Sequence, residues 1–328
     1  MLNRFDKYFC TSSNQYGFKK GVSCSNAVYN VRMSINYGST VNLCAVDLSK
    51  AFDKVNHNAL LIKLMNRKPP VELLYALEHL LSSCCTCVKW KSSLSAFFKI
   101  DFGVRQGSVL SPYLFAVLLD DIIDHFTFHN KLSIVLYADD ILLMAPSLSE
   151  LQRLFSVCES ELKWLDWCIN TKKTCCIYVL VRGMMSNVQN IVTSDGLELP
   201  WVDEIRYLGI FITRNRRFKC SFANLKRSFY RSVNAIFGKV LSTATVDAIL
   251  HLINSKCLPV LLYGLEVCPL TKADMQFLDF CVNRIFMKLF VTNNVSSLMN
   301  VDISSILNYR VNYCVSALLS FAQIARTL

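Results

Sequence analysis

The sequence predicts an α+β fold, in which a small antiparallel sheet is backed by helices and a helical C-terminal part follows. Three observations lead to this prediction. Residues 41–46 form a short apolar stretch typical of a buried strand. Two further apolar stretches flank an acidic turn at residues 138–140. Beyond residue 218 the apolar residues recur with helical spacing instead.

The elements up to residue 212 alternate closely. A helix over residues 58–66 should follow the first strand. Ser111 and Pro112 mark the start of a second helix, because serine is a frequent N-cap and proline fits the first turn. That helix should run to residue 123.

The acidic turn joins strands predicted at residues 132–137 and 141–144, which gives a tight hairpin with carboxylates at its tip. Ser149 and Gln152 have the spacing of a capping box, which predicts a helix up to residue 167. Further strands are expected at residues 174–181 and 206–212.

The C-terminal part begins with an amphipathic helix. Arg227 and Arg231 lie on its basic side. The opposite face carries five apolar residues: Phe222, Phe229, Val233, Ile236 and Val240.

Composition indicates a well-packed chain with one large or two modest domains. Of its 328 residues, 53% are hydrophobic, and the mean hydropathy is +0.33. An uncharged stretch such as residues 311–325 is shorter than the roughly 18–20 apolar residues of a membrane span. We therefore expect no membrane partner, and an intracellular protein of the nucleus and/or cytoplasm.

The net charge of +11 is concentrated in one block. Residues 206–239 contain nine Lys or Arg and no Asp or Glu. Such a block suits a polyanion such as nucleic acid. A solvated basic face without a partner is the alternative.

Fifteen cysteines at irregular spacing do not predict a disulfide framework, which belongs to small secreted chains. Cys84, Cys85 and Cys87 cluster, but no second pair stands at zinc-finger spacing. We expect reduced, buried thiols rather than a zinc site.

The sharpest feature is the pair Asp139 and Asp140 at the hairpin tip. At about 4 Å and an effective dielectric near 20, two like charges repel by roughly 4 kcal/mol. A divalent cation would turn this repulsion into ligation, and Mg²⁺ prefers such hard oxygen ligands. An ordinary, solvent-screened acidic turn is the alternative.

Asp47 ends the first apolar strand. Alone it is typical of a turn or cap residue. Together with Asp139 and Asp140 it could complete a site for two metal ions, which would polarise a 3′-hydroxyl and stabilise a leaving pyrophosphate.

Several motifs around these acids resemble those of reverse transcriptases from non-LTR (LINE-type) retrotransposons. Residues 45–55 resemble the first palm motif of that family, residues 103–112 its Gln-Gly motif, and residues 137–140 its metal-binding hairpin. Residues 15–21 resemble a fingers motif. Later segments resemble the lysine-bearing motif (170–174), the primer-grip hairpin (207–209) and part of the thumb (262–266).

The resemblance implies a right-hand polymerase palm with a helical thumb, and RNA-directed DNA synthesis from a primer. Residues 1–40 would be a remnant of the fingers, residues 41–212 the palm, and residues 213–328 the thumb with a C-terminal extension. Because little precedes residue 15, we expect a piece of a longer element protein that is weakly active or inactive alone.

The resemblance also implies site roles. Asp47 and Asp139 would bind two Mg²⁺ ions, with Mn²⁺ as the alternative, assisted by Asp140 and the Leu48 carbonyl. Phe52 would lie under the nucleotide sugar and exclude a 2′-hydroxyl. Gln106 and Gly107 would line the nucleotide pocket, where glycine permits close backbone approach.

Two lysines have roles with strong alternatives. Lys173 would neutralise or protonate the pyrophosphate, although a surface lysine is an equal interpretation. Lys19 would contact the triphosphate, but it stands where the family usually has arginine, and lysine cannot grip phosphate bidentately.

The expected partners are an RNA template, a DNA primer and dNTPs; the sequence does not indicate an oligomeric state. Two other classes of function stay open: an inactive relic that retains nucleic-acid binding, and a structural or partner-binding fragment. The residues expected to face the template–primer are Arg214, Arg216, Arg217, Arg227 and Arg231.

Overall fold

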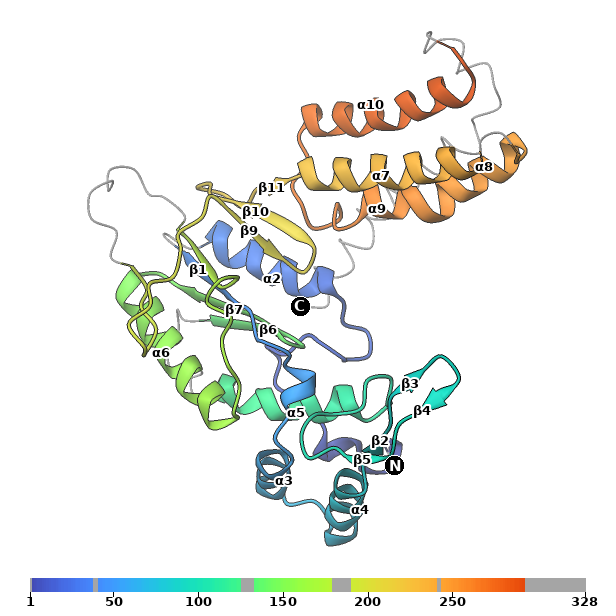
Figure 1. Ribbon diagram of the computed structural model, residues 1–328. Helices are drawn as coiled ribbons and strands as arrows, with labels where there is room; N and C mark the ends of the chain where they lie inside the picture. The colour runs from blue at the N-terminus through green and yellow to red at the C-terminus, as the bar shows by residue number, and fades with distance from the viewer. Residues whose placement is uncertain (1, 38–40, 125–132, 179–189, 241–242, 293–328) are drawn as a thin grey trace. The chain divides into compact units, whose positions relative to one another are not determined.

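The computed structural model describes residues 2–37, 41–124, 133–178, 190–240 and 243–292 (Figure 1). The chain divides into two compact units, Met1–Leu208 and Gly209–Leu328. Each unit is described separately below.

The first unit is built on a four-stranded antiparallel sheet. Its strand order is β6-β7-β1-β8, with bounds β6 Ser133–Tyr137, β7 Asp140–Ala145, β1 Asn42–Val46 and β8 Cys175–Tyr178. Strand β1 is central and pairs with β7 on one side and β8 on the other, so that Cys44 faces both Leu143 and Cys176. The predicted antiparallel sheet is confirmed.

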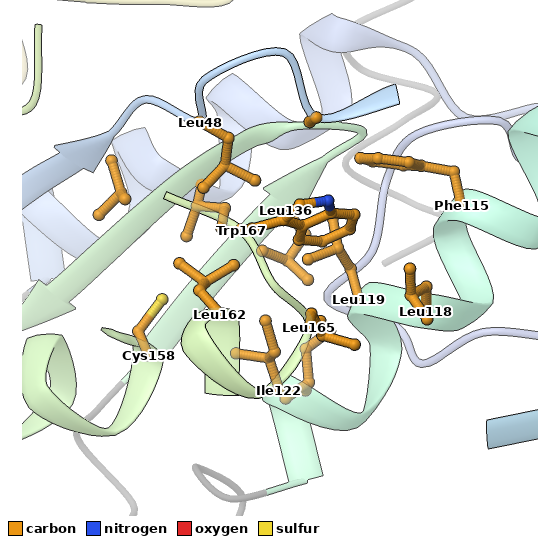
Figure 2. Packing of buried hydrophobic residues seen from close by; sticks show 14 of the residues in the cluster. Leu48, Phe115, Leu118, Leu119, Ile122, Leu136, Cys158, Leu162, Leu165 and Trp167 are labelled. Atoms are coloured by element: carbon orange, nitrogen blue, oxygen red, sulfur yellow. The ribbon is translucent and has the colours of Figure 1, made fainter. Parts of the chain in front are cut away.

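Both faces of this sheet are covered. Successive residues of β1 and β7 point to opposite faces, and nearly all of them are buried. Helices α5 (Ser111–Asp124) and α6 (Leu148–Trp164) supply the core of one face. Figure 2 shows Phe115, Leu119, Leu162 and Trp167 packed in this core. Helix α2 (Cys24–Tyr37) packs against β6.

Shorter elements complete the first unit. Helices α3 (His57–Asn66) and α4 (Val71–Ser82) pack together beside α5. Four two-residue strands follow α4, namely β2 Cys85–Thr86, β3 Lys89–Trp90, β4 Ser93–Leu94 and β5 Phe98–Lys99. The remaining elements are α1 (Leu2–Phe5), two 3₁₀ turns (Asp6–Tyr8 and Phe52–Lys54) and strand β9 (Glu204–Tyr207).

The second unit is mainly helical, as predicted. After the paired strands β10 (Ile210–Thr213) and β11 (Cys220–Ser221) come α7 (Ala223–Val240), α8 (Val246–Leu252), α9 (Leu258–Leu262) and α10 (Lys272–Leu289). A π-helical turn, Ile253–Cys257, joins α8 to α9. Phe229 and Val233 of α7 are buried as predicted; Phe237 is buried too, whereas Ile236 and Val240 are only half-buried.

Several predicted boundaries were wrong for local reasons. Helix α6 ends at Trp164 and not at residue 167, since Asp166 has a φ of 60°. Helix α6 is capped by Ser147, not Ser149, because the Ser147 hydroxyl accepts a hydrogen bond from the Glu150 amide. Ser111 is the first helical residue rather than a cap, since its hydroxyl donates to the Arg105 carbonyl at 2.7 Å. The strand expected at 206–212 is interrupted at Leu208 and Gly209, which both have positive φ.

The structure also bears on the predictions about cysteines and membrane spans. Cys84 is buried as expected, but Cys85 is exposed, so the description of this cluster as buried thiols was partly wrong. Among the helices that the structure describes, none is both long and apolar enough to cross a membrane.

Candidate active site

Asp47 and Asp140 lie beside each other at one end of the sheet. Val46 of β1 pairs with Ile141 of β7. Because the two strands are antiparallel, Asp47, which follows Val46, comes opposite Asp140, which precedes Ile141. Partial burial of the carboxyl raises the pKa of Asp140, and the charges of Asp139 and Asp47 raise it further; Arg206 opposes them. The site therefore concentrates negative charge.

The hairpin tip is tighter than predicted. Tyr137 pairs with Asp140, which makes Asp140 the first residue of β7 and leaves only Ala138 and Asp139 in the turn. Ala138 has a φ of 55°, a conformation that a residue with a side chain adopts rarely.

A segment near the N-terminus supports this hairpin. Gln15 forms a parallel bridge with Leu136, and the Tyr16 amide donates to the Leu136 carbonyl at 2.8 Å. A Cβ atom on Gly17 would lie 2.5 Å from the Ala138 nitrogen. Only glycine therefore lets these backbones approach so closely.

Residues 170–174 are held beside Asp47 by backbone and side-chain hydrogen bonds. The Asp47 carbonyl accepts from the Asn170 amide at 2.8 Å, and the Asp47 amide donates to Thr174 Oγ1 at 3.1 Å. Lys173 Nζ lies 3.8 Å from Asp47 Oδ2. The lysine is mostly exposed, so the ion pair itself contributes little to stability.

Phe52 is held by two other rings. It stacks on Phe115 with centroids 4.1 Å apart and meets Phe18 edge-on at 6.3 Å. Phe52 is half-buried, which leaves part of the ring accessible. Stacking on a fully buried phenylalanine fixes its orientation.

The loop that carries Gln106 is attached to the same turn. Gln106 Nε2 donates to Asp53 Oδ1 at 3.1 Å, and the Gly103 amide donates to the Val55 carbonyl at 2.8 Å. Gly107 is exposed, has a φ of 85°, and has open space where a Cβ would stand. The structure thus joins the loop of Gln106 and Gly107 to the turn that begins at Phe52.

Carboxylate oxygens are suitable ligands for a hard cation, and the mutual repulsion of Asp47, Asp139 and Asp140 favours one. In the described part of the chain, however, no three His, Cys, Asp or Glu side chains are arranged to hold a metal ion as they stand. Asp47 and Asp140 provide the neighbouring donors, and Asp139 extends from the adjacent turn.

These features coincide with a known family. A family model described as reverse transcriptase (RNA-dependent DNA polymerase) matches residues 1–212, which include the sheet, the acidic hairpin and the Gln106 loop. The chain belongs to the reverse transcriptase family. This confirms the family expected from the motifs.

The chain has curated relatives among the proteins of the retrotransposable elements R1 and R2 and of the mobile element jockey. It is 26% identical over 230 residues to the "Putative 115 kDa protein in type-1 retrotransposable element R1DM" of Drosophila melanogaster, covering 68% of this chain and 22% of the relative. It is also 26% identical over 255 residues to the R2 "Retrovirus-related Pol polyprotein" of Popillia japonica, covering 73% and 35%. The chain thus spans about a fifth to a third of these relatives.

A solved structure is similar to this chain in fold, and the similarity extends to the fold only. Telomerase from Candida albicans, in complex with a TWJ fragment of telomeric RNA, aligns over 92% of this chain and 54% of its own with a TM-score of 0.50. The sequence identity is 13%. The palm-like α+β architecture of this chain is therefore found in a telomerase of distant sequence.

The structure limits how two of the predicted nucleotide contacts, Lys19 and Leu48, could act. Lys19 Nζ donates to the carbonyls of Thr11 (3.1 Å) and Ser12, and burial lowers the pKa of this lysine. The Leu48 side chain is buried in the core (Figure 2), so only its backbone could serve a ligand.

The predicted basic residues lie on the second unit of the chain, in and around β10 and α7. Arg216, Arg217, Arg227 and Arg231 are exposed, whereas Arg214 is half-buried. Sequence reasoning missed a groove of about 720 Å³ between α7 and α10. Its cations are Lys226, Arg284 and Lys288, which lie over the rings of Phe277, Phe280 and Phe237. The i,i+4 spacing of Arg284 and Lys288 was the available signal.

Proposed function

We propose that this chain catalyses RNA-directed DNA synthesis, in which the 3′-hydroxyl of a DNA primer attacks a dNTP opposite an RNA template. The observation that supports this most is the adjacency of Asp47 and Asp140 on β1 and β7, within a domain of the reverse transcriptase family. Neighbouring carboxylates at a hairpin tip suit phosphoryl transfer, where catalysis is mainly positioning and charge stabilisation.

Asp47 and Asp139, with Asp140 and the Leu48 carbonyl as further donors, would hold two Mg²⁺ ions, for which Mn²⁺ is the alternative. Bound there, such ions polarise the attacking hydroxyl and stabilise the leaving pyrophosphate. The raised pKa of Asp140 supports this assignment, because a cation would relieve the repulsion that raises it.

The surrounding residues have roles consistent with their contacts. Phe52, fixed by Phe115, would exclude a ribose 2′-hydroxyl by steric contact. Gln106 and Gly107 would border the nucleotide, because their loop is bonded to the turn at Asp53. Lys173, beside Asp47, would neutralise or protonate the pyrophosphate, and Lys19 would need to leave its carbonyl partners to reach a phosphate. We place this activity in the nucleus and/or cytoplasm.

Primer extension on an RNA template with Mg²⁺ tests the proposal. Asp47→Asn and Asp139→Asn should each lower the rate at least about 1,000-fold, because several kcal/mol of transition-state stabilisation are removed. Asp195→Asn is the matched control: this exposed carboxylate pairs with Lys163 at 3.5 Å, and its replacement should leave the rate unchanged.

Two results would contradict the proposal. Extension by Asp47→Asn at the wild-type rate would exclude the carboxylate edge as the catalytic site. A wild-type chain that binds primer–template but does not extend it would instead support the inactive relic that retains nucleic-acid binding.

A further inference from the structure

Residues 84–102 form a β-ribbon that the roles above do not use. Strand β2 pairs with β5, and β3 pairs with β4 beyond them. Figure 1 shows β3 and β4 as a hairpin that extends from the first unit. Two-stranded ribbons of this kind are marginally stable alone. Such a ribbon therefore has more need of a partner than the buried sheet.

The ribbon exposes large apolar side chains on both faces. Trp90 and Phe97 are each 75% exposed, and Leu94 is 63% exposed. Lys89 pairs with Leu94, and Trp90 pairs with Ser93. Since successive residues of a strand point to opposite faces, Trp90 and Leu94 lie on different faces. In the part of the chain that the structure describes, neither face is covered, so both faces are open to a partner.

Lysines alternate with the exposed rings. Lys89 and Lys91 flank Trp90, and Lys99 follows Phe97 and Phe98. The single acid of the segment, Asp101, pairs with Lys99 at 3.3 Å, and both are exposed. Lysine is depleted in the cores of protein interfaces. Interleaved cations and aromatic rings favour single-stranded nucleic acid, whose bases stack while its phosphates meet the cations.

The ribbon is connected to the candidate active site through its second strand. Phe102 forms an antiparallel bridge with Asn56, and the next residue, Gly103, donates to Val55. The chain then continues directly into the Gln106 loop, which is bonded to Asp53. The base of the ribbon therefore lies next to the turn that carries Phe52.

We infer that the unpaired RNA template wraps this narrow ribbon, with bases stacked on Trp90 and Phe97 and phosphates bound by Lys89 on the opposite face and by Lys91 and Lys99. The inference rests on the proposed polymerase function and deepens it by assigning a site for the single-stranded part of the substrate. A base-paired duplex cannot serve, because its bases are already stacked and their faces are covered.

Binding of a 20-nucleotide oligo(rA), measured by tryptophan fluorescence without Mg²⁺ or dNTP, tests the site. Stacking on Trp90 should quench its emission. Trp90→Ala should abolish most of the quench and weaken binding about tenfold, and Phe97→Ala should weaken it similarly. Both side chains are exposed, so the fold does not depend on them.

Trp164 provides the matched control. It is 50% exposed and also lies beside a lysine, with Lys63 Nζ 5.3 Å from its ring centre, but it is on α6. Trp164→Ala should retain both the quench and the affinity. Replacing Lys89, Lys91 and Lys99 together with Gln should flatten the slope of log affinity against log salt by about 0.7 for each phosphate that is no longer neutralised.

Failure of this inference can be told apart from failure of the polymerase proposal. Wild-type affinity in Trp90→Ala, or equal weakening for a blunt duplex, would overturn the ribbon site whatever the extension assay shows. Self-association of the chain that Trp90→Ala abolishes, with oligo(rA) affinity unchanged, would assign the ribbon to a protein partner instead. Asp195→Asn should bind oligo(rA) as the wild type does, because this exposed carboxylate is outside both the ribbon and the acidic site.

Discussion

At the scale of single residues, Asp47, Asp139 and Asp140 form an acidic edge of the sheet, in which Asp140 is repelled by the other two carboxylates. Asp140 is exposed overall, yet neighbouring atoms shield its carboxyl, and the charges of Asp139 and Asp47 repel it. The adjacent Tyr207 is buried, and its hydroxyl donates to the Val135 carbonyl at 3.4 Å. Burial raises the pKa of Tyr207, with a further contribution from Asp140, so this phenol stays neutral and adds no charge to the site.

The pKa of Asp140 predicts a pH-dependent stability. Because the folded pKa lies above the unfolded value, folding favours the protonated carboxyl. Its stabilising contribution is present at low pH and is lost as pH rises through the folded pKa. Asp140→Asn, which cannot ionise, should therefore raise the Tm at pH 8 by up to about 3 °C without metal, and by less at pH 4. Thermal unfolding at both pH values measures this.

Asp195→Asn serves as the comparison for that measurement. Asp195 is exposed and pairs with Lys163 at 3.5 Å, so solvent screens its charge. Its replacement should change the Tm little at either pH. A lower Tm for Asp140→Asn at pH 8 would mean that the carboxylate stabilises the fold and that our account of the site is wrong.

At the scale of elements, the sequence predicted the strands, the hairpin and helix 58–66 because their apolar patterns are local. The helix is capped by Asn56, which accepts from the amides of Asn58 and Ala59. The grouping of Asp47 with Asp139 and Asp140 was implied by the motif resemblance, because local patterns do not show that the separated strands β1 and β7 lie side by side. Contacts that depend on tertiary approach were not predictable. The bond from Gln106 to Asp53 joins residues far apart in sequence, and nothing local distinguishes Gly17 from an ordinary turn glycine.

The contact of Gly17 with the hairpin tip is a test at this scale. In Gly17→Ala the new methyl group would meet the backbone nitrogen of Ala138 at 2.5 Å, which a flexible side chain cannot relieve. Either the bridge between Gln15 and Leu136 or the hairpin must shift. We expect stability to fall by about 1–3 kcal/mol, measured by urea unfolding, and primer extension to be slower.

Gly238→Ala is the control for the same substitution. Gly238 lies within α7, and a Cβ there meets nothing within 4 Å. Alanine is the better helix former, so this variant should be unchanged or stabilised by up to about 1 kcal/mol. Equal stability of the Gly17→Ala and Gly238→Ala proteins would show that the N-terminal segment does not pack on the hairpin.

At the scale of the whole molecule, the candidate catalytic residues and the predicted nucleic-acid-binding residues lie in different units. The candidate catalytic and nucleotide contacts lie within Met1–Leu208, whereas the predicted basic residues lie within Gly209–Leu328. The latter unit also holds the α7–α10 groove with Lys226, Arg284 and Lys288. Substitutions in the second unit can therefore change the electrostatic attraction of the chain for nucleic acid while Asp47, Asp139 and Asp140 stay in place. This separation makes the role of the second unit testable by itself.

Arg227 and Arg231 are the most direct test of that role. Both are exposed on α7, opposite its buried residues Phe229 and Val233. Each phosphate contact that is removed should flatten the slope of log affinity against log salt by about 0.7–0.9 for a primer–template. Arg227→Gln with Arg231→Gln should therefore reduce the slope by about 1.4–1.8, measured by anisotropy over a series of salt concentrations.

A control with the same change of charge shows whether position matters. Lys68 and Arg153 are exposed residues of the first unit, on the α3–α4 connection and on α6. Replacing both with Gln lowers the net charge equally but should leave the slope unchanged. If the slope falls equally in the two double variants, binding follows net charge alone, and the basic block is only a solvated surface. If it falls only in the α7 variant, those arginines contact phosphate, because counterion release depends on local contacts and not on the total charge.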